Sequence, residues 1–302
     1  MPASYRQGAA IIGISDCEQA PAAPVPAALQ ALMNTIQRSD ELATWLGTPP
    51  GRYLLAWEQA QLDRVVADLF GFHALQIGLP ELDALQNNRM PQRWLADEHV
   101  GGCRAAALLC DSDALPFPER SLDLVVLPHT LELARDPHRT LAEVERVLLP
   151  EGRVVILGFN PTSLWGLRQR GGRWRQRIGG RSPLFLPRPG DSIGYRRLRD
   201  WLRLLSFEVE GGRFGGYRPP LTSERWLTRW DWIDDVGERW WPVFGAVYML
   251  VAVKRVRGMR LVGLAKRERD RGHAQVAPAV VANRETAPTV LQTSIVHDSP
   301  QQ

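Results

Sequence analysis

Acidic and polar residues follow four short apolar runs of this 302-residue chain. Carboxylates accept hydrogen bonds from hydroxyl and amino groups, a glycine lets a ligand approach the backbone, and a histidine can act as a base. Residues of these types at the ends of successive strands predict a binding site. In chain order the candidates are Gln76, Gly78, Asp97, Glu98, Asp111, Ser112, Pro128 and His129.

The apolar runs that place these residues are predicted strands. We expect strands over 73–79, 93–96, 105–110 and 122–127. The run over 122–127 is apolar almost throughout, which is typical of a central parallel strand buried on both faces. Ligands of open α/β sheets bind beyond the carboxyl ends of the strands, where the strand order reverses. The candidate residues are therefore expected to share one crevice.

Helices are predicted between and after these strands. A helix over 53–70 has one apolar face and stops at Gly71. A second begins with Asp136 as N-cap and Pro137 at its first position, and Gly152 is its expected stop. Further helices are expected over 195–205 and 224–240, and further strands over 153–159, 207–214 and 246–254. This alternation predicts an α/β fold with a mostly parallel sheet and helices on both faces.

Charge and composition divide the chain into three parts. Residues 1–28 and 257–302 are rich in Ala and Pro or in charge, with little apolar periodicity, so we expect a disordered arm and a disordered basic tail around a domain over 29–256. The net charge of +4 is concentrated in two segments: seven arginines and no acid lie between 162 and 190, and 254–271 carries a net +6.

Several function classes are excluded. No apolar run is long enough to span a membrane and no signal-peptide core is present, so we expect a cytoplasmic protein. Cys17, Cys103 and Cys110 lack the spacing of a zinc site or a disulfide framework, and no metal site is expected. The motifs of metalloproteases, serine hydrolases and phosphate-binding loops are absent.

Two stretches carry a family resemblance. The first, DSDALPFPERSLDLVV, covers 111–126, and the second runs from DPHR at 136–139 to EVERVLLPEGR at 143–153. Together they closely resemble the class I, type 11 methyltransferases, and GFNP at 158–161 with WGLR at 165–168 resembles an uncharacterised bacterial branch of that family. The resemblance implies a Rossmann-like, seven-stranded, mostly parallel sheet with an antiparallel last strand, and S-adenosylmethionine as cofactor.

The resemblance also implies roles for the candidate residues. Gln76 and Gly78 would approach the methionine part of the cofactor, Asp97 or Glu98 the ribose hydroxyls, and Asp111 and Ser112 the adenine. Pro128 and His129 would face the sulfonium and the substrate, with His129 as the catalytic candidate. Each has a structural alternative, because strand-end acids are often only solvated and Asp111 can cap its own turn. A strand-end histidine can likewise be a hydrogen-bonded structural residue.

The first loop departs from the family pattern. The family has an acid followed by glycines at every second position, whereas 76–82 reads QIGLPEL. Gln76 replaces the acid, and Pro80 lacks an N–H. Two functions therefore stay open: an S-adenosylmethionine-dependent methyltransferase, and a non-catalytic binding or scaffolding protein with an altered cofactor loop. A nicotinamide oxidoreductase would need G-x-G-x-x-G after the first strand, which is absent.

A basic insertion is expected over 160–197, where such folds build a substrate lid. It holds Trp165, Trp174, Phe185 and the arginine cluster. Arginines between aromatic residues can hold nucleic acid, an anionic small molecule or lipid head groups, or they can belong to a solvated loop. The sequence leaves the methyl acceptor unidentified.

Overall fold

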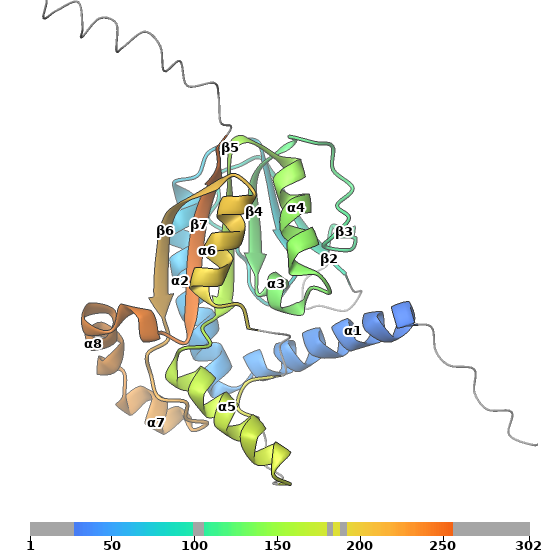
Figure 1. The fold of residues 1–302 in the computed structure, drawn as a ribbon. Helices are drawn as coiled ribbons and strands as arrows, with labels where there is room; N and C mark the ends of the chain where they lie inside the picture. The colour runs from blue at the N-terminus through green and yellow to red at the C-terminus, as the bar shows by residue number, and fades with distance from the viewer. Residues whose placement is uncertain (1–26, 99–105, 180–183, 188–191, 256–302) are drawn as a thin grey trace, which may run out of the picture. The chain divides into compact units, whose positions relative to one another are not determined.

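The computed structural model describes residues 27–98, 106–179, 184–187 and 192–255 (Figure 1). The chain divides into two units, 1–256 and 257–302, and the second lies outside the described residues. The predicted arm over 1–28 also lies outside the described residues, except for Ala27 and Ala28, which begin the first helix. No helix of the described ranges is long and apolar enough to cross a bilayer. Within them, no group of three or more His, Cys, Asp or Glu side chains is arranged to hold a metal ion.

One seven-stranded sheet organises the domain, in the order β3-β2-β1-β4-β5-β7-β6. Strands β1 to β5 are parallel, and β7 is antiparallel to both of its neighbours. The chain order reverses between β1 and β4. This arrangement confirms the predicted fold class. The strands are β1 (His73–Ile77), β2 (Gln92–Asp97), β3 (Leu108–Leu109), β4 (Leu122–Pro128), β5 (Leu148–Phe159), β6 (Phe207–Gly215) and β7 (Val247–Lys254).

Helices cover both faces of the sheet. One core cluster joins α1 and α2 to one face, and a second joins α4 and α6 to the other (Figure 1). The helices are α1 (Ala27–Leu46), α2 (Pro49–Ala67), α3 (Thr130–Leu133), α4 (Pro137–Val147), α5 (Leu164–Arg177), α6 (Tyr195–Leu204), α7 (Glu224–Arg229) and α8 (Trp232–Trp240), with a 3₁₀ turn, η1 (Pro242–Phe244).

Helix α4 begins as predicted and ends earlier. The Asp136 side chain accepts hydrogen bonds from the backbone N–H groups of His138 at 3.0 Å and Arg139 at 3.3 Å. This satisfies N–H groups that the first turn leaves without a helical partner. The helix ends at Val147 rather than near Gly152, because Leu148 already pairs with Leu122 of β4.

Two predicted elements were wrong. The expected buried strand over 105–110 is only the two-residue edge strand β3, in which Leu109 is 53 % exposed. The expected single helix over 224–240 is two helices, α7 and α8, separated at Trp230 and Asp231. Asp231 pairs with Arg218 at this break. The insertion expected over 160–197 contains helix α5.

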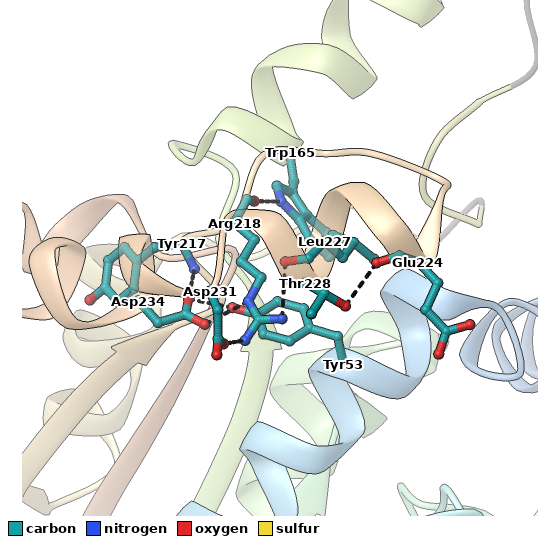
Figure 2. Close-up of polar contacts among 9 residues, drawn as sticks. All are labelled: Tyr53, Trp165, Tyr217, Arg218, Glu224, Leu227, Thr228, Asp231 and Asp234. Carbon is teal, nitrogen blue, oxygen red and sulfur yellow. Dashed lines mark hydrogen bonds and ion pairs between the residues drawn. The ribbon is translucent and has the colours of Figure 1, made fainter.

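Arg218 lies at a junction of several helices, which Figure 2 shows. Its Nε donates to Asp234 of α8 at 2.8 Å, and its guanidinium lies 4.3 Å from the centre of the Tyr53 ring of α2. Its carbonyl accepts from Nε1 of Trp165 of α5 at 2.7 Å. The Tyr53 hydroxyl also donates to Asp234, and burial together with that carboxylate raises the pKa of Tyr53. The junction thus ties α2, α5 and α8 together.

Candidate functional site

A pocket of about 200 Å³ lies at the carboxyl ends of β1, β2 and β4, where the strand order reverses. Parallel sheets of this kind bind their ligands at this position. Its sheet side is built by strand ends, the segments that follow them and helix α3: Ile77, Gly78, Leu79, Pro80, Glu81, Asp97, Glu98, Pro128, Thr130, Leu133 and Ala134. Four of the predicted site residues, Gly78, Asp97, Glu98 and Pro128, are in this set.

Helix α1 forms the opposite wall, and sequence reasoning missed it. It contributes Thr35, Ile36, Ser39, Asp40, Leu42 and Ala43. A usable signal was present, because Leu29, Leu32, Ile36, Ala43 and Leu46 recur at helical spacing. The Ala- and Pro-rich stretch before them favoured the prediction of a disordered arm over 1–28, and no helix was predicted after it.

Gln76 shapes the loop that borders the pocket. Its side chain is buried, and its Nε2 donates to the carbonyls of Gly78 at 3.1 Å, Leu79 at 3.0 Å and Leu82 at 2.8 Å. Its Oε1 accepts from the backbone N–H of Ala84 at 3.0 Å. Gln76 does not line the pocket. The structure therefore shows a loop held by an amide where the sequence predicted a ligand contact.

Gly78 is required by its backbone conformation. Its φ is +76°, a region that side-chain-bearing residues rarely adopt, and its N–H donates to the carbonyl of Ala96 at 2.8 Å. A Cβ at this position would lie 3.5 Å from Oγ1 of Thr130, which is ordinary contact. The backbone conformation thus gives a reason for a glycine here within the protein, and the expected close approach of a cofactor to Gly78 stays a prediction.

The pocket is acidic. Asp40, Glu81, Asp97 and Glu98 line it, and none of its described lining residues is basic. Burial raises the pKa of Glu81, and the neighbouring charges of Asp97 and Asp40 raise it further. Such a concentration of carboxylates favours a cationic ligand, whose charge would offset their mutual repulsion.

Glu98 and Ser112, which follow the neighbouring strands β2 and β3, are hydrogen-bonded to each other. Oε1 of Glu98 accepts from the backbone N–H of Ser112 at 3.1 Å and from its hydroxyl at 2.7 Å. Ser112 is buried and Asp111 is exposed, and neither lines the pocket. Their predicted contact with an adenine ring stays a prediction.

His129 lies between two pocket-lining residues in the chain and belongs to a buried ion-pair cluster. Its side chain is fully buried, with Nε2 2.8 Å from Oε1 of Glu58 and Nδ1 3.1 Å from Oε2 of Glu132. Burial alone would lower the pKa of His129, but the charges of both carboxylates and their hydrogen bonds raise it to about 10. Pro128 and Thr130 line the pocket and His129 does not. Its surroundings match the structural alternative that the sequence left open.

Comparisons with known proteins agree with the sequence motifs. Residues 84–156 match the family model described as a methyltransferase domain, a range that contains both stretches of the predicted resemblance. The chain is 35 % identical over 169 residues, 55 % of its length, to the uncharacterized protein YafS of Escherichia coli, and spans 65 % of that protein. It is 39 % identical over 59 residues, 20 % of its length, to the ubiquinone/menaquinone biosynthesis C-methyltransferase UbiE of Paraburkholderia phytofirmans, and spans 24 % of it.

A SAM-dependent methyltransferase from Archaeoglobus fulgidus aligns with a TM-score of 0.48 and 20 % identity. The alignment covers 66 % of this chain and 94 % of that one.

Proposed function

We propose that this chain transfers a methyl group from S-adenosylmethionine to an acceptor. The premise is that residues 84–156 belong to the methyltransferase-domain family. The observation that carries the proposal is the acidic pocket at the point where the strand order reverses. S-adenosylmethionine is cationic at its sulfonium and its ammonium group, so four lining carboxylates and no basic side chain suit it.

The residues around the pocket fit the parts of such a ligand. Asp97 and Glu98 present carboxylates at the end of β2, where they would accept hydrogen bonds from ribose hydroxyls. Gly78, at the end of β1, offers backbone without a side chain toward the methionine part. When bound, the cofactor supplies an electrophilic methyl group on a positively charged sulfur. The chain would then act by orienting the acceptor beside Pro128 and Thr130 and by excluding water, without a further cofactor.

The alternative is a binding or scaffolding protein that keeps the fold without turnover. It rests on the loop, where Gln76 takes the place of an acid and Pro80 is buried. The loop is nevertheless well formed, since each polar atom of the Gln76 amide has a partner. We therefore favour the methyltransferase.

Calorimetry tests the cofactor assignment directly. The full-length protein should bind S-adenosylmethionine and its demethylated product. Asp97→Ala should weaken binding by about 5- to 150-fold, the equivalent of losing one charge-assisted hydrogen-bond acceptor. Glu119→Ala, an exposed acid outside the pocket, is the matched control and should bind normally.

Two results would count against the proposal. Absence of binding at millimolar ligand by a folded protein would favour the scaffolding alternative, and equal affinity of the Asp97→Ala variant would remove β2 from the site. Turnover is checked with methyl-labelled cofactor and a cell extract. Label should enter a product above the level of the extract alone with the wild-type protein and with the control, and more slowly with the Asp97→Ala variant.

A further inference from the structure

Helix α5 presents an apolar stripe to solvent. Leu164 is 54 % exposed, Leu167 63 %, Trp174 65 % and Ile178, directly after the helix, 63 %. These positions, with Gly171 between them, recur at intervals of three and four residues and so lie along one side of a helix. The opposite side, which holds Trp165, Gly166 and Gln169, is buried. The stripe therefore faces away from the protein.

Arginines flank this stripe on both sides. Helical spacing places Arg168 and Arg175 along one edge and Arg170 and Arg177 along the other. Arg173 completes the set, and the sequence from 162 to 190 contains no acid to neutralise them. The surface therefore combines aliphatic and tryptophan side chains with concentrated positive charge.

The first half of α5 is firmly anchored. Trp165 is buried, donates to the carbonyl of Arg218 as Figure 2 shows, and packs edge-on against Trp45 and Phe185. Gln169 exchanges two hydrogen bonds with the backbone of Leu186. From Arg173 to Ile178 every residue is exposed, and Figure 1 shows this end of α5 directed away from the sheet. An anchored helix with a free outer face is suited to contact an extended surface.

We propose that α5 binds the surface of a membrane that contains anionic phospholipid. The stripe would enter the boundary between head groups and acyl chains, and the flanking arginines would contact phosphates while their aliphatic stems lie along the apolar layer. This inference is independent of methyl transfer. Nucleic acid fits less well, because Leu164, Leu167 and Ile178 cannot stack on bases as aromatic side chains do.

A second group of exposed tryptophans is not part of this surface. Trp232 and Trp240 of α8 are 57 % and 70 % exposed. Four acids, Asp231, Asp234, Asp235 and Glu238, lie in the same segment and carry charge that an anionic membrane would repel. Charge complementarity therefore selects α5.

Co-sedimentation with phospholipid vesicles tests the proposal on the full-length chain. The protein should sediment with vesicles of phosphatidylcholine and phosphatidylglycerol, and much less with phosphatidylcholine alone or in high salt. Leu167→Ser with Trp174→Ser should reduce the partition coefficient by at least about tenfold. The double variant Arg170→Gln with Arg177→Gln should reduce the partition coefficient by about 30-fold, because each arginine is expected to contribute a factor of about five.

The matched control replaces two exposed apolar residues elsewhere, Phe72→Ser with Leu204→Ser. Phe72 is 70 % and Leu204 83 % exposed, and they precede β1 and β6, at the amino ends of the strands, whereas α5 follows the carboxyl end of β5. The control should bind vesicles like wild type, and melting temperatures should show that all variants are folded.

Three outcomes would overturn the proposal. The first is a wild-type protein that does not sediment with anionic vesicles. The second is vesicle binding that neither pair of α5 substitutions reduces, which would assign the binding to another segment such as the basic tail. The third is a protein that does not bind vesicles but binds single-stranded RNA through Arg170 and Arg177, which would make α5 a nucleic-acid-binding surface.

Discussion

Gln76 stands where the family pattern has an acid, and the loop that follows β1 is nevertheless well formed around it. A glutamine amide carries both donors and an acceptor, whereas an ionised carboxylate only accepts. Gln76 uses both capacities, donating to three carbonyls and accepting from Ala84. The residue that departs from the family pattern in sequence is therefore the one that closes the loop in the structure.

Restoring the family's acid should harm this protein. In a Gln76→Glu variant the buried carboxylate would face the carbonyl oxygens of Gly78, Leu79 and Leu82, and those acceptors would lose their donor. We expect unfolding to become easier by about 1–3 kcal/mol and cofactor affinity to fall with it. Thermal unfolding and calorimetry measure the two effects. Tighter binding at an unchanged melting temperature would instead show that position 76 contacts the ligand.

At the scale of elements, the His129 cluster joins three parts of the fold. Glu58 lies on α2, Glu132 lies on α3, and Glu132 also accepts the backbone N–H of Phe159 at the end of β5 at 2.7 Å. Buried charges of this kind are costly to remove from water and are tolerated when they are paired. The cluster thus ties the end of β4, next to the pocket, to α2, α3 and the end of β5.

This cluster should make stability depend on pH. The pKa of His129 is raised from 6.5 to about 10, so the folded state holds its proton more tightly than the unfolded chain. The stabilisation is complete below pH 6.5 and is lost as the pH rises toward 10. Burial also raises the pKa of Glu132, which acts in the same direction at lower pH.

Chemical unfolding at a series of pH values measures the effect. The wild-type free energy of unfolding should fall between pH 6.5 and 10, and His129→Gln should lose most of that fall. The same variant should cost about 3–5 kcal/mol near pH 6, because Glu58 and Glu132 remain buried without a cation. A His129→Gln protein with the wild-type pH profile would show that the imidazole is neutral in the fold.

Elements with strong local signals could be predicted from the sequence. The cap at Asp136 and the apolar run of β4 depend on neighbouring residues, and both were found. Helix α1 was not predicted, although its apolar residues recur at helical spacing. The length of β3 was predicted wrongly, because it is an edge strand whose length is set by its pairing with β2.

The site divides in the same way. Gly78, Asp97, Glu98 and Pro128 were placed by strand ends alone, and all four line the pocket. The environments of Gln76 and His129 are set by contacts that span the fold, as between His129 and Glu58, and composition does not reveal such contacts.

At the scale of the whole molecule, the fold should not need its tail. The first unit ends at Val256, and Lys254 and Arg255 already anchor the end of β7 through ion pairs with Glu145, Glu151 and Glu208. A chain that ends after residue 256 should therefore melt within a degree or so of the full-length protein, because the removed sequence has little apolar periodicity. Differential scanning calorimetry of both chains checks this, and a large fall would place core contacts in 257–302.

The two edges of the sheet bear on how the protein behaves at high concentration. An open edge strand offers unpaired backbone groups to another molecule and can seed aggregation. At one edge β3 is only two residues long, too short to template a new strand. At the other, β6 is irregular between Val209 and Gly211 and carries Glu208, Glu210 and Arg213. Both edges therefore disfavour the addition of a strand from another molecule, so the protein should resist edge-to-edge aggregation even at high concentration.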